Sequence, residues 1–299
     1  MYNLLSLLAG VAIAILVTLN GQLSSAHGVF VSAVIIHIVG ILFAILLLLI
    51  LRKKFTFKST CPAWAYLGGV IGVLTTVFNN FSFGKISVTS ILALGLFGQT
   101  VTALLFDHFG ILGTKKQTFK VTSLFGLVFA LGGIFMMFDA SSGIVLYAIL
   151  LSVAAGVSNV LSRSVNAVLA NEIGALQGSL INHIAGLPVC VVVLFLLGRN
   201  ELTAEFAFHG STPWIYIGGA FGVIAVLLYN IVVPKVPAFY VTLLAFIGQV
   251  FAGLVIDVMM NNGYSKRTMI GGVLVSVGVG INMILEQIAC KRRQGGGGE

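Results

Sequence analysis

Four polar side chains lie deep inside long apolar segments of this sequence. They are Gln99, Gln249, His37 and His183. On a helical rise of about 1.5 Å per residue, each lies within a few ångströms of the middle of its segment. Polar groups at that depth of a membrane are costly and by default mark functional sites. Glutamine amides donate and accept hydrogen bonds, and histidines do likewise or take up a proton. We therefore expect a substrate-binding cluster, with interhelical hydrogen bonding as the alternative role.

Four asparagines lie further from the middle of their segments. Asn20 and Asn166 lie toward one end, and we add them to the expected substrate-binding residues. Asn80 and Asn230 lie about 9 Å from the centre, where they could line a pathway to that site. Helix capping or interhelical hydrogen bonding is the alternative for all four.

Three charged residues accompany the apolar segments. Asp107 and Asp257 lie at segment ends, where a carboxylate can stay solvated, so a gate or a loop-fixing role is as plausible as substrate contact. Arg163 would give a cavity positive character if it points inward together with Asn159, one helical turn earlier. The simpler account for Arg163 is that its side chain extends to the membrane interface.

The composition predicts an all-α membrane protein. Hydrophobic residues make up 59% of the 299 positions and charged residues 8%, whereas about a quarter of the residues in an average soluble domain are charged. A helix that crosses the hydrocarbon core needs roughly 20 apolar residues. Ten segments meet this need, and their expected ranges are 4–24, 29–51, 63–84, 87–107, 119–138, 144–165, 174–197, 213–233, 238–259 and 268–288.

The basic residues indicate orientation in the membrane. The net charge of +8 could suggest a nucleic-acid partner, but such a partner needs Lys and Arg on one exposed face. Here they lie in short runs between apolar segments, so we expect no nucleic acid. If the N-terminus is cytoplasmic, twelve of the 16 basic residues fall on the cytoplasmic side. The positive-inside rule therefore predicts that both termini are cytoplasmic.

The sequence repeats itself with an offset of 146 and later 150 positions. The matched pairs include polar and tryptophan residues, which coincide less easily than apolar ones: Asn20 with Asn166, His37 with His183, Trp64 with Trp214, Asn80 with Asn230, Gln99 with Gln249 and Asp107 with Asp257. An internal duplication explains these pairs. We expect a first five-helix repeat at 1–143 and a second at 144–290. Residues 291–299 form a basic tail with a glycine-rich end typical of a cloning addition.

An odd number of helices in each repeat inverts the second repeat relative to the first. The loop after the second segment is basic, from Arg52 to Lys58, whereas its counterpart balances Arg199 against Glu201 and Glu205. One loop is therefore expected inside and its copy outside. Inverted repeats are the architecture by which many secondary transporters achieve alternating access, with the site near the midplane.

The pairs Gly98-Gln99 and Gly248-Gln249, with an aspartate eight positions later in each repeat, resemble the YdcZ-like family of the drug/metabolite transporter superfamily. The Asn20/Asn166 and His37/His183 pairs carry the same likeness, which covers residues 1 to 290. The resemblance implies a ten-helix bundle in the bacterial cytoplasmic (inner) membrane, but no particular substrate. The sister small multidrug resistance family has a glutamate midway along its first helix, whereas the segment 4–24 contains no acid. Its proton-coupled mechanism is therefore not carried over.

We predict a secondary transporter of a small polar or amphipathic metabolite, which works as a monomer whose halves form an internal pseudo-dimer in contact with membrane lipid. No nucleotide-binding motif occurs, and three scattered cysteines predict neither a disulfide nor a metal site, so we expect no cofactor. One alternative is a non-transporting scaffold or assembly subunit, whose polar midplane residues would satisfy one another without a cavity. An intramembrane enzyme that uses His37, His183 or Asp107-His108 is disfavoured, because each candidate except His108 occurs twice and no nucleophile motif is present.

Overall fold

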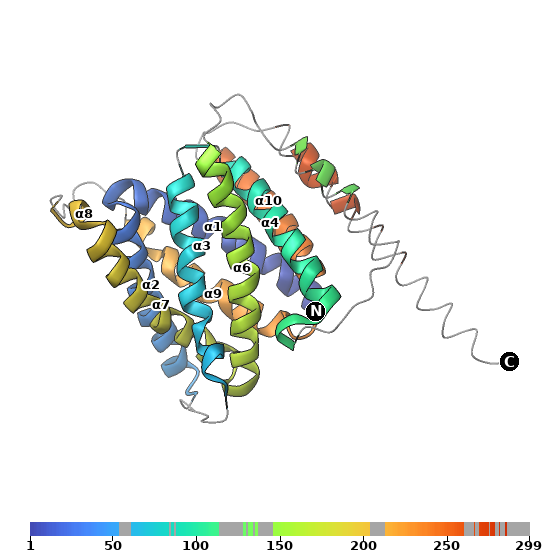
Figure 1. Cartoon of the computed structure of the whole chain (residues 1–299). Coiled ribbons are helices and arrows are strands. Elements are labelled where there is room, and N and C mark those ends of the chain that lie inside the picture. Colours follow the sequence, from blue (N-terminus) through green and yellow to red (C-terminus); the bar gives the residue numbers. More distant parts are fainter. Residues whose placement is uncertain are drawn as a thin grey trace.

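The computed structural model describes residues 1–53, 61–83, 85–86, 88–113, 146–203 and 213–259, with short stretches within 128–136 and 266–285. The named elements of these residues are all helices (Figure 1). The α-helices are α1 (Tyr2–His27), α2 (Val29–Ile50), α3 (Gly68–Ser82), α4 (Val88–Phe109), α6 (Leu146–Ile173), α7 (Ala175–Leu197), α8 (Arg199–Thr203), α9 (Gly218–Val232) and α10 (Ala238–Met259). Short 3-10 helices, η1 (Ala63–Leu67) and η3 (Pro213–Ile217), lead into α3 and α9, and η2 (Ile111–Gly113) follows α4.

Seven helices of the described residues are long and apolar enough to cross a membrane, which confirms an all-helical membrane protein. They are Tyr2–His27, Val29–Ile50, Ile91–Phe109, Leu146–Ile173, Ala175–Leu197, Pro213–Val232 and Ala238–Ile256. Parts of the expected spans at 119–138 and 268–288 lie outside the described residues.

Two helices differ from their expected form. The helix α6 continues to Ile173 instead of ending near 165, because the polar residues around 165 are buried in the protein interior: Ser162, Arg163, Ser164 and Asn166. The segment 63–82 is helical throughout but is not among the seven spans. It carries Thr75, Thr76 and Asn79, which dilute its apolar character.

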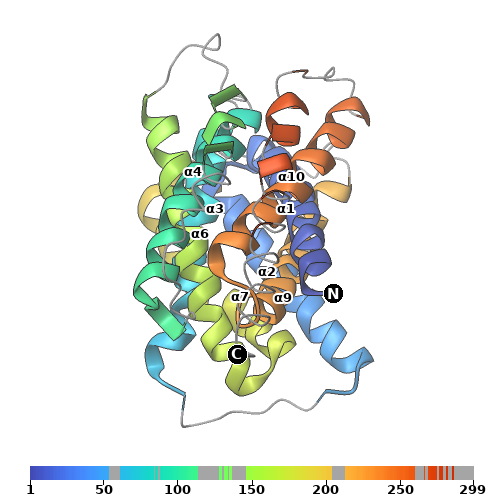
Figure 2. The same cartoon turned by 90° about the vertical axis from the view of Figure 1, so that its right-hand side faces the viewer.

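The helices form three groups, as the contacts between them show. The helix α6 packs against α3 and α4, and α1 packs against α9 and α10 (Figure 2). The third group is α2 with α7, which lies at one side of the view in Figure 1. The helices α2 and α7 are antiparallel, since Glu201, just after α7, contacts the first turn of α2. This arrangement places α1 and α6 each against helices of the other half of the sequence.

Small residues allow the helices to approach closely at their crossings. A Cβ atom at Gly10 would overlap the carbonyl group of Ala245, and one at Gly156 would overlap the carbonyl of Gly95. Without large side chains at these positions, backbones pack directly against each other, which is a usual basis of helix association in membranes. The contact of α1 with α10 therefore has its counterpart in the contact of α6 with α4.

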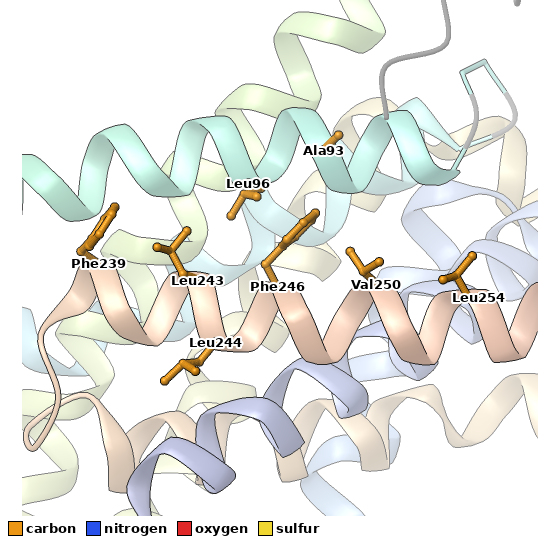
Figure 3. Packing of buried hydrophobic residues seen from close by; sticks show 8 residues of the cluster. All are labelled: Ala93, Leu96, Phe239, Leu243, Leu244, Phe246, Val250 and Leu254. Carbon is orange, nitrogen blue, oxygen red and sulfur yellow. The ribbon is translucent and has the colours of Figure 1, made fainter. Parts of the chain in front are cut away.

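The helices α4 and α10 meet along an apolar seam (Figure 3). On α10 the buried residues recur every three or four positions, as one face of a helix requires: Phe239, Leu243, Phe246, Val250 and Leu254. They pack against Ala93 and Leu96 of α4, whereas Leu244 points away from this seam. The seam joins a helix of each half of the chain and lies apart from the polar residues that form the site.

Candidate functional site

A cavity of about 140 Å³ lies among six helices, namely α1, α2, α3, α6, α7 and α9. It is lined by six of the residues selected from the sequence, which are Asn20, His37, Arg163, Asn166, His183 and Asn230. Each half of the chain contributes three helices to the wall. The structure thus brings together side chains that are up to about 210 positions apart in the sequence.

His37 and His183 form a pair where α2 crosses α7. Their ring centroids are 5.7 Å apart, and their Nδ1 atoms lie 2.8 Å and 3.0 Å from the carbonyl oxygens of Ala33 and Ser179, respectively. A carbonyl oxygen only accepts, so each Nδ1 carries the proton and donates it. In the neutral ring, Nε2 is then left as a hydrogen-bond acceptor.

Asn166 belongs to a hydrogen-bonded group in the wall between α6 and α7. Its Nδ2 donates to Asn182 Oδ1 at 2.7 Å and lies 3.3 Å from Ser162 Oγ. The Ser162 hydroxyl in turn donates to the carbonyl of Gly68 on α3, at 2.8 Å. These bonds fix the positions of three polar side chains that line the cavity.

Several amide oxygens in the wall have no hydrogen-bond partner among the described residues. They are the Oδ1 atoms of Asn20, Asn159, Asn166 and Asn230. The amide nitrogen of Asn230 does have one, since it donates to the carbonyl of Ala175 at 3.0 Å. An unsatisfied buried polar atom costs about 1 to 3 kcal/mol, and such atoms occur preferentially where a ligand binds or strain is useful.

Arg163 is 3% exposed, so its side chain is buried among the helices. Its guanidinium donates to the carbonyl of Ala238 at 3.3 Å, to Thr242 Oγ1 and, at 3.4 Å, to Gln99 Oε1. The Cζ atom lies 5.3 Å from the ring centroid of Tyr229, a cation–π contact. The side chain of Arg163 therefore points into the helix bundle, the inward direction that would give the cavity positive character.

The carboxylate of Asp107 caps a helix outside the cavity wall. It accepts hydrogen bonds from the backbone N–H groups of Ala238 and Phe239 at 3.0 and 2.9 Å, at the start of α10. These amides have no partner within the helix, and a negative charge there also interacts favourably with the helix dipole. The geometry of Asp107 is that of a structural cap, while the side chain of Asp257 lies outside the described residues.

The two glutamines are buried but do not line the cavity. Gln99 contacts Arg163, as noted, and Gln249 is 4% exposed on α10. Asn80 lines a smaller cavity of about 50 Å³ that shares Asn20 with the central one, and its Nδ2 lies 3.3 Å from Ser32 Oγ. Asn80 therefore lies at a small space beside the central cavity.

The sequence analysis missed several polar lining residues. They are Thr75, Thr76 and Asn79 of α3, Ser162 of α6, Asn182 of α7 and Tyr229 of α9. Selection by matched pairs excluded them, because their counterparts at the repeat offsets are different residues, such as Ile36 for Asn182. The direct neighbours Asn79-Asn80 and Asn182-His183 were the available signal.

Known proteins resemble this chain in fold and in sequence family. A solved structure described only as "Crystal structure of protein" matches with a TM-score of 0.69 and 14% identity, over 96% of this chain and 97% of the other. No curated protein matches the sequence. A family model described as "Putative inner membrane exporter, YdcZ" matches in two segments, residues 1–136 and 147–285. The predicted resemblance is confirmed, and the family is one of transporters and not of enzymes. The chain therefore belongs to the YdcZ family of the drug/metabolite transporter superfamily, a family of multi-pass inner membrane proteins described as exporters.

Proposed function

We propose that this chain is a secondary active transporter that moves a small polar or amphipathic solute through the central cavity by alternating access. The supporting observation is the cavity itself, which is built from helices of both halves and carries polar atoms that the described protein leaves unpaired. A solute that enters the cavity can supply the missing hydrogen bonds.

An arrangement as two inverted five-helix repeats supports this mechanism. Contacts made by one half recur in the other at the repeat offsets. Gly98 lies against the carbonyl of Val153, and Gly248 lies against the carbonyl of Leu7. Two halves that pack through equivalent contacts can exchange their conformations, which opens the site first to one face and then to the other.

We assign solute contact to the six selected residues that line the cavity. Asn20, Asn166 and Asn230 supply amide groups, His37 and His183 supply acceptor nitrogens, and Arg163 supplies a positive charge. Gln99 acts through Arg163, and Asp107 fixes the start of α10. The pathway residue Asn80 lies beside the second cavity.

A non-transporting scaffold is the second candidate function. It requires polar midplane residues that satisfy one another around a filled interior. The cavity and the unpaired oxygens of Asn20 and Asn166 favour the transporter. We further propose that both termini are cytoplasmic and that a single chain is sufficient for transport.

Access to the cavity from both sides tests this proposal. In a background without the three native cysteines, Thr76→Cys and its repeat counterpart Val226→Cys place one thiol in the cavity wall. A membrane-impermeant maleimide applied to oriented vesicles, from either side in turn, should label both variants. Labelling from only one side, or from neither, would contradict alternating access.

Two matched variants control the labelling. Leu42→Cys places the thiol on a helix face that is 62% exposed in the protein and surrounded by apolar residues, so it should remain unlabelled. Asn200→Cys, at the exposed end of a membrane helix, should be labelled from one side alone.

A further inference from the structure

The two walls of the cavity differ in polarity although they occupy equivalent places in the repeats. The helices α3, α6 and α7 contribute Thr75, Asn159, Ser162, Arg163 and Asn182. At the equivalent offsets, α9, α1 and α2 contribute the apolar residues Ala225, Ile13, Leu16, Val17 and Ile36. The cavity is therefore amphipathic: the wall of α3, α6 and α7 is polar, whereas the wall of α1, α2 and α9 combines these apolar residues with Asn20, His37, Tyr229 and Asn230.

The charge of the cavity wall is positive. Among the described residues that line it, Arg163 is the one Lys or Arg, and none is Asp or Glu. The carboxylate of Asp107 interacts electrostatically with Arg163 and compensates part of its charge, but it caps α10 outside the cavity wall. The described wall itself offers a cation and no carboxylate, so an anionic ligand in the cavity would be stabilised beside Arg163.

The hydrogen bonds of Arg163 leave its Nε available. The two terminal nitrogens bind Gln99, Ala238 and Thr242, and the Tyr229 side chain also interacts with the guanidinium, while Nε makes no well-aligned hydrogen bond among the described residues. Asn159, one turn earlier on the same face of α6, also lines the cavity. Its unpaired oxygen is an acceptor and offers no bond to an anion, so the donor on this part of the wall is the guanidinium of Arg163.

We propose that the cavity binds a small amphipathic monocarboxylate, whose anionic group lies at Arg163 and whose apolar part lies against Ile13, Leu16 and Ile36. This inference rests on the proposed function and names its substrate class. A monoanion matches a single guanidinium with one free N–H group, whereas a doubly charged phosphate would require more cations. A cationic solute would meet the buried charge of Arg163 without a carboxylate in the described wall.

The size of the cavity limits the solute. A cavity of about 140 Å³ is close to an engineered apolar cavity of about 150 Å³ that binds benzene. The solute therefore has on the order of six to ten non-hydrogen atoms. Hexanoate, hexanamide and hexylamine have this size and share one chain, while their head groups are anionic, neutral and cationic.

Binding of these three probes to the purified full-length protein tests the proposal. Thermal unfolding in detergent, followed as a function of probe concentration, gives an apparent dissociation constant for each, because a ligand of the native state raises the unfolding temperature. Hexanoate should bind at least about tenfold more tightly than hexanamide, since a hydrogen bond to a charged group is stronger than a neutral one. Hexylamine should bind most weakly.

Matched variants assign the preference to Arg163. In Arg163→Gln the ratio of the hexanoate and hexanamide constants should fall to about one, and Arg163→Lys should retain part of it. Arg199→Gln removes the same charge at an exposed position and should leave the ratio unchanged. Leu16→Ser should weaken the binding of hexanoate and of hexanamide by the same factor, because it changes only an apolar residue of the wall.

The proposal is overturned if hexanoate shows no saturable binding, if the two constants are equal in the unaltered protein, or if the ratio persists in Arg163→Gln. If Arg163→Gln does not fold, the comparison of hexanoate with hexanamide in the unaltered protein still tests whether the cavity prefers an anionic head group. Labelling of the cavity from both sides does not depend on any probe. If the cavity is labelled from both sides but the protein binds hexylamine most tightly, the proposed transporter function stands and the proposed carboxylate substrate is rejected.

Discussion

The imidazole ring of His183 packs on Gly40 of α2, and the ring of His37 packs on Gly186 of α7. The two rings are 5.7 Å apart at an angle of 55°. Each histidine thus occupies the space that a missing side chain leaves on the opposite helix. This reciprocal contact lets α2 and α7 cross closely at the cavity wall.

The contact predicts that even one added methyl group on α2 is harmful. A Cβ atom in Gly40→Ala would overlap the His183 ring, and overpacking of this kind costs about 1 to 3 kcal/mol. We expect a lower unfolding temperature in detergent, measured by circular dichroism. Gly253→Ala is the control, because a Cβ atom there meets nothing within 4 Å and alanine favours a helix. Equal effects of the two substitutions would contradict the packing.

Glu201 is predicted to stabilise the start of α2. Its carboxylate accepts hydrogen bonds from the N–H groups of Val29, Phe30 and Val31 at 2.9 to 3.0 Å. Glu201→Ala removes all three, and we expect a loss of about 2 kcal/mol, because hydrogen bonds to charged groups are strong and the charge faces the positive end of a helix.

Amide hydrogen exchange checks this cap locally. Exchange at residues 29 to 31 should accelerate in Glu201→Ala, and less so in Glu201→Gln, which retains one acceptor oxygen. Unchanged exchange at these three amides in Glu201→Ala would show that the cap contributes nothing.

Asp107 is predicted to act on stability more than on solute contact. Asp107→Ala leaves the amides of Ala238 and Phe239 without their acceptor, and we expect a lower unfolding temperature, equivalent to about 1 to 3 kcal/mol. His108→Ala, at the exposed neighbouring position, should have little effect. If Asp107→Ala unfolds at the same temperature as the unaltered protein, Asp107 does not stabilise the start of α10.

The proposed inversion of the repeats predicts opposite locations for two exposed positions. Lys53 follows α2, and Asn200 lies at the corresponding end of α7, which runs antiparallel to α2. In the background without native cysteines, Lys53→Cys should react with an impermeant maleimide from the cytoplasmic side and Asn200→Cys from the other. Reaction of both from one side would disprove the inverted topology.

The sequence predicted the all-helical membrane class and the family, but depth along a segment did not reveal which polar residues line the cavity. Depth in a segment selected Gln99 and Gln249, yet both are buried outside the cavity wall. Depth along a helix can be counted in the sequence, whereas the direction of a side chain around the helix depends on which neighbours pack against it.

Arg163 illustrates the same limit. Its sequence position allows either an interfacial or an inward side chain, and the choice depends on acceptors from α4 and α10, which are distant in the sequence. The difference in polarity between the two walls of the cavity was also not predicted. A search for matched pairs discards positions such as Asn182 and Ile36, where the two halves differ.

The amino-acid sequence alone determined that the chain is an all-helical membrane protein, and it located the seven apolar helices found among the described residues. These properties follow from local apolar composition, since the bilayer requires backbone groups to be satisfied within each helix. Only the tertiary structure decided which polar side chains share a cavity, because glycine contacts between distant helices set how closely and at which faces the helices meet.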